Sequence, residues 1–191
     1  MARSMSRLLS PAGFGLILVL FLLPFVSVSC EAPGFGTLNA DYTGFDLAAN
    51  AAPSFEVDGV RTERALSDQA LPAAGVQVLA STVIALLVVG AATALLSRRR
   101  LRFLAGTATA ALAAAVLIVT QLLAESNLAN ASQAQLEDFS PVASEALTDA
   151  IGPGIGFLLA LTGLAVLAAG NLVAGLRVRQ LRPPPPAPPP H

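Results

Sequence analysis

The hydrophobic and polar positions of the chain divide it into four long apolar stretches, which cover residues 12–29, 75–96, 101–124 and 151–176. Apart from Arg102, near the start of the third, no ionisable residue lies within them. Each is close to the ~20 residues that a helix needs to cross a bilayer. Backbone polar groups in hydrocarbon must be satisfied within the chain, so each stretch is predicted to be a transmembrane helix. The predicted fold class is an all-α membrane protein built as a four-transmembrane-helix bundle.

The segment between the first two stretches, residues 30–74, is too long for a bare connection and is predicted to fold. Its clearest element is a β-hairpin over residues 54–63, in which Asp58-Gly59 forms the turn. The alternation places Glu56 opposite Arg61 across the hairpin. Residues 37–42 can supply a third strand, and residues 44–49 a helical turn.

The segment between the last two stretches, residues 125–150, is predicted to contain a short amphipathic helix. Its apolar positions recur every three or four residues, at Leu136, Phe139, Val142, Ala146 and Leu147. Acidic residues occupy the positions between them. This helix and the hairpin of residues 54–63 together are predicted to form a small extracytoplasmic cap.

The charges indicate the orientation in the membrane. Nine of the 11 arginines lie in or next to three segments, residues 1–11, 97–100 and 177–191. All 12 acidic residues lie in the two long loops. Because arginine marks the cytoplasmic side, both termini are predicted to be cytoplasmic and the two long loops external. The last of these segments ends in a proline-rich tail, predicted to be an extended terminus or a ligand for a domain that binds Pro-rich segments.

Composition narrows the chemistry. The chain of 191 residues is 54% hydrophobic and 12% charged, with a net charge of −1, which argues against a nucleic-acid partner. It has no lysine, one cysteine, and one histidine at its last position, His191. We therefore expect no enzyme, no cofactor and no metal site. Carboxylates remain as the candidates for an enzyme on the outer face, with Asp41, Asp46 and Asp58 first among them.

Cys30 directly follows the first apolar stretch. It is a candidate for lipidation or for an intermolecular disulfide, and it can also remain a free thiol. Lipidation requires the first stretch to be a cleaved signal, which leaves a lipoprotein with three spans. Ser27 stands three residues before the cysteine, where a lipoprotein signal favours an aliphatic residue.

Small residues recur at four-residue spacing within the predicted helices and let helix backbones approach. They indicate packing inside the bundle or, as the alternative, a homo-oligomer interface. These candidates are Gly90, Ala94, Gly106, Ala110, Ala114, Gly152, Gly156, Gly170 and Ala174.

The turn between the second and third stretches is strongly basic. Its arginines are candidate contacts for anionic membrane lipid, and they also suffice as topology determinants. They are Arg98, Arg99, Arg100 and Arg102.

Two parts of the chain resemble a recurring pattern. Residues 23–30 read LPFVSVSC, and residues 42–48 read YTGFDLA. This combination resembles uncharacterised four-span membrane proteins of GC-rich bacteria, over about a sixth of the chain. The resemblance implies no known activity. It implies an uncleaved first helix and a place in the bacterial cytoplasmic membrane.

The sequence thus predicts a non-enzymatic accessory or envelope-interaction protein that acts through its acidic outer cap. A membrane or envelope protein is the expected partner. The alternative is a small transporter or channel subunit, for which Asn171 and Thr162 within the fourth stretch are the polar candidates.

Overall fold

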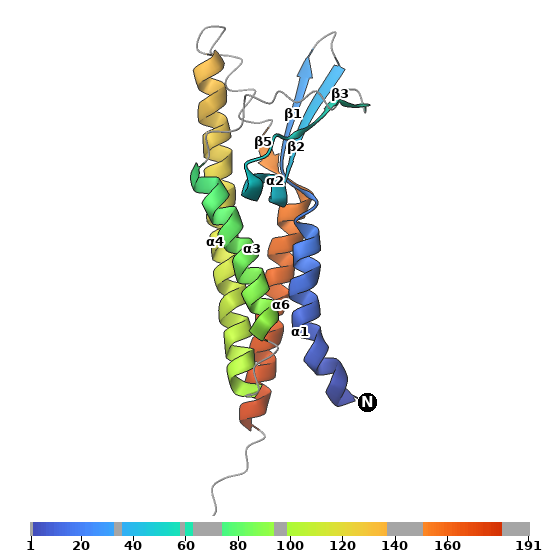
Figure 1. The fold of residues 1–191 in the computed structure, drawn as a ribbon, viewed down its shortest axis with the longest axis vertical. Coiled ribbons are helices and arrows are strands. Elements are labelled where there is room, and N and C mark those ends of the chain that lie inside the picture. Colours follow the sequence, from blue (N-terminus) through green and yellow to red (C-terminus); the bar gives the residue numbers. More distant parts are fainter. Residues whose placement is uncertain are drawn as a thin grey trace, which may run out of the picture.

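The computed structural model describes residues 2–32, 36–57, 60–62, 74–93, 99–136 and 151–180. They form a helical bundle with a small β-sheet at one end (Figure 1). The elements are, in chain order, α1 (Ala2–Leu20), β1 (Pro24–Ala32), β2 (Gly36–Thr43), α2 (Gly44–Ala49), β3 (Ser54–Val57), β4 (Val60–Thr62), α3 (Ala74–Ala92), α4 (Arg99–Leu136), β5 (Ile151–Pro153) and α6 (Ile155–Gln180).

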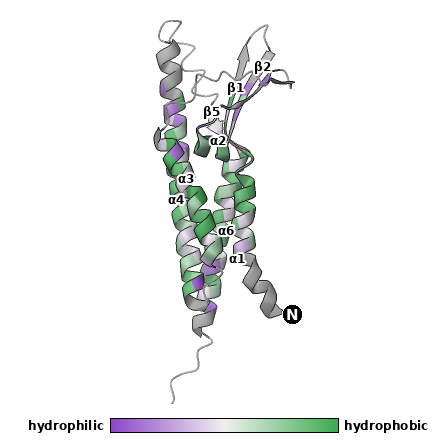
Figure 2. Ribbon diagram, in the orientation of Figure 1, coloured by the Kyte–Doolittle hydropathy of each residue, from purple (hydrophilic) through white to green (hydrophobic). Residues whose placement is uncertain are grey.

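Three helices are long and apolar enough to span a membrane. The qualifying segments are Gly75–Ala92 in α3, Leu101–Leu128 in α4 and Ile155–Arg177 in α6. Much of their length is green in Figure 2, the colour of hydrophobic residues. Large aliphatic side chains face outward from all three, with Val88, Leu122 and Val166 each more than half exposed. Such an exposed apolar belt is what a helix bundle needs in contact with lipid.

The first predicted span, residues 12–29, is wrong as a single helix. Helix α1 ends at Leu20, and the strand β1 begins at Pro24. The apolar part of α1 covers Pro11–Leu20, ten residues, which reach about 15 Å along a helix axis. The physical reason lies in the sequence of β1, where Pro24 disfavours continuation of the helix and Val-Ser-Val-Ser alternates with the period of a strand.

The sheet has five antiparallel strands in the order β4-β3-β2-β1-β5. β3 and β4 pair with Glu56 opposite Arg61, the register expected for the hairpin. β2 covers the expected third strand, and α2 occupies the six residues of the expected helical turn. β5 was not expected, because residues 151–153 lie in the predicted fourth span; α6 begins only at Ile155.

The strands β1 and β2 have one apolar and one polar face. Val26 pairs with Tyr42 and Val28 with Ala40, whereas the residues between them pair Ser27 with Asp41 and Ser29 with Asn39. Successive side chains of a strand point to opposite sides, so the first four residues share one face and the last four share the other. Val26 and Tyr42 are buried at the end of the sheet nearest the bundle.

Helix α4 is longer than the predicted third span. It runs for 38 residues to Leu136, so residues 125–136 are helical where a loop had been expected. Gln121 Nε2 donates a hydrogen bond of 2.9 Å to Glu125 Oε1 one turn later, and Leu128 packs against the core. The apolar positions 139–147 of the predicted amphipathic helix lie outside the described residues, as does the proline-rich tail.

One hydrophobic core runs through the bundle and into the sheet. Phe14 and Ile17 of α1, Leu87 of α3 and Leu164 of α6 are almost completely buried within the bundle. Phe25 of β1 continues the same core at the sheet. The sheet is therefore packed onto the bundle rather than tethered to it.

Candidate functional site

The sheet meets the bundle at a cluster of aromatic rings and glycines, which we call the junction (Phe21, Phe25, Gly44, Phe45 and Gly154). The rings of Phe21 and Phe25 lie 4.6 Å apart, and those of Phe21 and Phe45 lie 6.1 Å apart in an edge-to-face arrangement. Gly44 lies against the ring of Phe21, where a Cβ atom would come within 2.5 Å of Phe21 Cδ1. No other residue fits at position 44 without moving that ring.

Helix α2 is fixed at the junction by a capping box. Thr43 Oγ1 accepts a 3.1 Å hydrogen bond from Asp46 N, while Asp46 Oδ2 accepts one of 2.9 Å from Thr43 N. Two backbone donors at the start of the helix are thereby satisfied. Ser81 Oγ on α3 also donates to Ala48 O, at 3.3 Å, so α2 is tied to the bundle.

The strand β5 closes the junction from the other side. Gly154 N donates a 2.7 Å hydrogen bond to Phe25 O. Backbone packs directly on backbone here, because a Cβ atom on Gly154 would lie 2.6 Å from the carbonyl carbon of Pro24. Residues 23–30 and 42–48 thus meet at one packed corner of the molecule.

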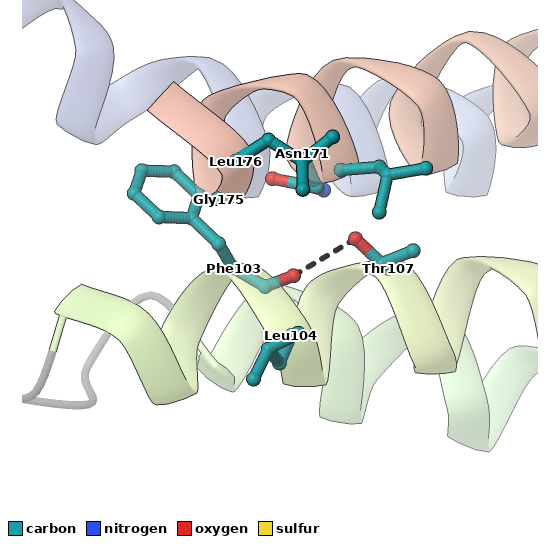
Figure 3. Close-up of a pocket in the computed structure, with 7 residues that line it drawn as sticks. Phe103, Leu104, Thr107, Asn171, Gly175 and Leu176 are labelled. Carbon is teal, nitrogen blue, oxygen red and sulfur yellow. Dashed lines mark hydrogen bonds between the residues drawn. The ribbon is translucent and has the colours of Figure 1, made fainter. Parts of the chain in front are cut away.

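A pocket of about 70 Å³ lies between α4 and α6 (Figure 3). The start of α4 and the end of α6, whose residues line it, lie at the end of the bundle away from the sheet (Figure 1). We call it the α4–α6 pocket. Figure 3 shows Asn171 pointing from α6 toward Phe103 and Thr107 of α4. The lining residues are Phe103, Leu104, Thr107, Asn171, Leu172, Gly175 and Leu176.

Asn171 is the unusual residue of this pocket. Its side chain is 7% exposed, and its Nδ2 is the one buried side-chain nitrogen or oxygen among the described residues that lacks a hydrogen-bond partner. The hydroxyl of Thr107 also lines the pocket, but it donates a 2.9 Å bond to Phe103 O (Figure 3) and accepts none from Asn171 Nδ2. An unpaired amide donor in an apolar site costs about 1–3 kcal/mol, so an acceptor that entered the pocket would be bound favourably.

Of the four candidate arginines for lipid contact, Arg102 lies next to this pocket. The guanidinium of Arg102 lies 5.2 Å from the centre of the Phe103 ring, and Phe103 lines the pocket. Arg99 and Arg100 form the first turn of α4. Arg98 lies outside the described residues.

The small-residue candidates have different surroundings. Gly90 lies against Phe14 of α1, Gly106 against Asn171 of α6, and Gly156 against Pro24 and Leu23. Gly152 and Gly170 have open space where a side chain would be. Ala110 is completely buried, Ala114 packs against the core, and Ala174 is half-buried. Ala94 lies outside the described residues.

The remaining candidates do not form a reactive cluster. Cys30 lies in β1, paired with Leu38 of β2. Asp46 is used by the capping box, Asp41 lies on the polar face of the sheet, and Asp58 falls outside the described residues. Within the described part of the chain, no three His, Cys, Asp or Glu residues lie close enough together to hold a metal ion.

Sequence reasoning did not identify the α4–α6 pocket. Asn171 was noted as a polar residue within a span, but Phe103, Thr107 and Gly175 gave no signal of their own. They meet Asn171 only because α4 and α6 pack side by side. The signal available in the sequence was that Asn171 is the one asparagine among the apolar residues of α6.

The fold and its two sites define a mostly helical, membrane-embedded protein that carries a β-sheet at one end of its bundle. Comparison of the chain with known protein families, curated proteins and solved structures gave no match.

Proposed function

We propose that this protein is a four-helix membrane protein whose outer cap associates with another membrane or envelope protein, and that it acts without catalysis. The observation that carries the proposal is the amphipathic sheet packed onto the end of the bundle. Its apolar face joins the core at Val26 and Tyr42, while Ser29 and Asn39 lie on its other face. A fixed polar surface held outside the membrane is suited to recognition.

In this proposal α1 is the fourth membrane helix. It packs against α3 and α6, and its outward residues Leu16 and Val19 are more than half exposed, as on the three long spans. An apolar face that continues the belt of its neighbours belongs in lipid. The 19 residues of α1 reach about 28 Å along the helix axis, close to the ~30 Å hydrocarbon layer. Phe21 and the start of β1 would then lie at one membrane surface, with Arg3 and Arg7 toward the other.

The proposed orientation places the sheet outside and the arginine-rich ends of α4 and α6 in the cytoplasm of a bacterial cell. The cap is then acidic, with Asp41 and Glu56 on neighbouring strands. Complementarity favours a partner surface that offers cations and hydrogen-bond donors.

Retention of the N-terminal segment is part of the proposal. Cleavage before Cys30 would remove Phe14, Ile17, Phe21 and Phe25, which belong to the hydrophobic core. Each of the four is at most 2% exposed. Truncation of a single buried phenylalanine to alanine already costs about 3–5 kcal/mol of folding stability. This favours an uncleaved α1 over a lipoprotein with three spans.

The transporter alternative has weaker support. The hydroxyls of Thr82, Thr109 and Thr162 each donate to a carbonyl of their own helix, at 2.7–2.8 Å. Their donors are satisfied within one helix, and Thr82 and Thr162 are exposed on the outside of the bundle instead of facing its interior.

Site-specific photocrosslinking in native membranes tests the proposal. A photoreactive residue at Asn39 on the polar face of the sheet is expected to capture a defined protein, whereas one at Leu122 on the lipid-facing side of α4 is expected to capture none. Capture at Asn39 should fall in the charge-reversal variant Asp41→Arg. It should persist in Asp46→Asn, because the carboxylate of Asp46 lies in the capping box of α2. If Asn39 yields only lipid adducts, or if Asp41→Arg leaves its capture unchanged, the proposed role of the cap is wrong.

A further inference from the structure

We propose that the α4–α6 pocket binds the glycerol-ester region of an anionic phospholipid, with the amide of Asn171 donating to an ester carbonyl and Arg102 contacting the phosphate. This inference is independent of any partner of the cap. It rests on the membrane-spanning character of α4 and α6 and on four features of the pocket, which are its depth, its opening, its unpaired donor and its neighbouring charge.

The depth of the pocket suits the ester region. Asn171 lies six residues before Arg177, where the apolar span of α6 ends, and therefore about 9 Å from that end along the helix axis. On α4, Phe103 and Thr107 lie within the first two turns of the span that begins at Leu101. The spans of α4 and α6 have 28 and 23 residues, about 42 and 35 Å, so their ends extend beyond the ~30 Å hydrocarbon layer. The pocket therefore lies just inside the edge of that layer, below the ester carbonyls that lie between it and the headgroups.

The pocket opens toward lipid. Leu104, Leu172 and Leu176 line it, and each is about half exposed on the outside of the bundle. A volume of about 70 Å³ is smaller than the ~150 Å³ cavity that accepts a benzene ring. It therefore fits one small group of a lipid, while the acyl chains lie along the exposed leucines.

The pocket contains a hydrogen-bond donor that has no acceptor. Asn171 Nδ2 has none, since the hydroxyl of Thr107 donates to Phe103 O and accepts no hydrogen bond from the amide. The last torsion of an asparagine side chain is soft, so a small rotation turns the N–H toward the pocket. An ester carbonyl is an acceptor with apolar flanks, which matches one donor among leucines and a phenylalanine.

The charge beside the pocket selects a phosphate. The Arg102 guanidinium lies over the ring of Phe103, a lining residue, and pairs with no carboxylate within the described residues. Helix α4 begins at Arg99, so Arg102 and Phe103 lie near its N-terminus, where the helix dipole is positive. A cation next to a helix N-terminus attracts a phosphate, and a net negative headgroup is favoured over a zwitterionic one.

Native mass spectrometry of the detergent-solubilised full chain tests the proposal with three lipids of equal chain length. Phosphatidylglycerol with ester-linked chains should bind about tenfold more tightly than phosphatidylcholine, because about 1.4 kcal/mol of added charge interaction corresponds to a factor of ten. Phosphatidylglycerol with ether-linked chains lacks both carbonyls, and the wild-type chain should bind it about three- to tenfold more weakly than the ester form, which is the range of one hydrogen bond.

Matched variants separate the two contacts. Asn171→Leu should abolish the preference for ester over ether chains and keep the preference for phosphatidylglycerol, whereas Arg102→Gln should do the reverse. Gly175→Ala partly fills the pocket, since its Cβ would lie 3.6 Å from that of Phe103, an ordinary contact that leaves the fold intact. This variant should bind ester-linked phosphatidylglycerol more weakly than the wild-type chain. Thr162→Val, on α6 outside the pocket, should change nothing.

Two results would overturn the proposal. Equal binding of ester and ether lipids by the wild-type chain would exclude the carbonyl contact and would leave only water in the pocket. An unchanged ester preference in Asn171→Leu would show that the amide serves another purpose, such as contact between two copies of the chain.

Discussion

The junction and the α4–α6 pocket lie at opposite ends of the same bundle and are built in opposite ways. At the junction, glycines let backbone and aromatic rings come into direct contact, and Gly154 and Asp46 have their hydrogen-bond partners. At the pocket, space remains between two helices and a buried amide nitrogen has no partner. The difference indicates that one end is optimised for rigidity, whereas the other retains an unsatisfied group at a cost in stability, as ligand sites do.

The largest expected effect comes from filling the junction. Gly154→Ala would place a methyl group against the Pro24 carbonyl, which belongs to the backbone and cannot rotate away. We expect a loss of about 3 kcal/mol, at the upper end of the usual cost of overpacking, and a lower midpoint of thermal unfolding in detergent. Gly152→Ala is the matched control, since it has open space, and should leave the midpoint nearly unchanged. Equal midpoints for the two variants would contradict the packing described for the junction.

A smaller loss is expected from the capping box. Asp46→Ala removes the acceptor of the Thr43 backbone N–H and should cost about 1 kcal/mol, measured as the same shift of the unfolding midpoint. Asp41→Ala, on the polar face of the sheet, changes the same net charge and should stay within about 0.5 kcal/mol of wild type. If Asp41→Ala is the more damaging of the two, the capping box does not stabilise the junction.

At the pocket the sign of the effect should reverse. Asn171→Leu replaces an unpaired buried amide by an apolar side chain of similar size, so the unfolding midpoint in lipid-free detergent should stay level or rise by an amount equivalent to about 1 kcal/mol. The same midpoint, measured without added lipid, should fall if Asn171 has an internal role in holding α4 to α6.

The smallest effect concerns Tyr42. Burial disfavours the phenolate and raises the pKa of this tyrosine above its ordinary value of 10.0. The unfolded state therefore loses its proton first, so stability from this group is intact below pH 10 and falls as the pH rises through the raised pKa. Tyr42 is the single tyrosine and the chain has no tryptophan, so near-ultraviolet absorbance follows it alone. A pKa of Tyr42 at or below 10 would mean that its ring is not buried between the sheet and the bundle.

Much of this architecture was predictable, and the exceptions have physical causes. Hydropathy found the three long spans because lipid-facing helices must be apolar throughout, and Asp58-Gly59 indicated the hairpin. Residues 24–29 were assigned to a helix because they extend an apolar run, although Val26 and Val28 alternate with serines. β5 has three residues and pairs with β1, which lies more than 120 positions earlier in the chain. No local sequence pattern therefore predicts this strand. The α4–α6 pocket depends on how side chains of two helices interlock, which spacing along one chain does not reveal.

The central claim is that α1 crosses the membrane, with the sheet outside the cell and the arginine-rich ends of α4 and α6 in the cytoplasm. Labelling of single cysteines in sealed cells by a membrane-impermeant maleimide tests it, in a Cys30→Ser background. Ser29→Cys, exposed on the polar face of β1, should react in sealed cells, whereas Ser4→Cys in α1 and Gln180→Cys at the end of α6 should react only after permeabilisation. Reaction of Ser4→Cys in sealed cells, or protection of Ser29→Cys until the membrane is opened, would contradict the account.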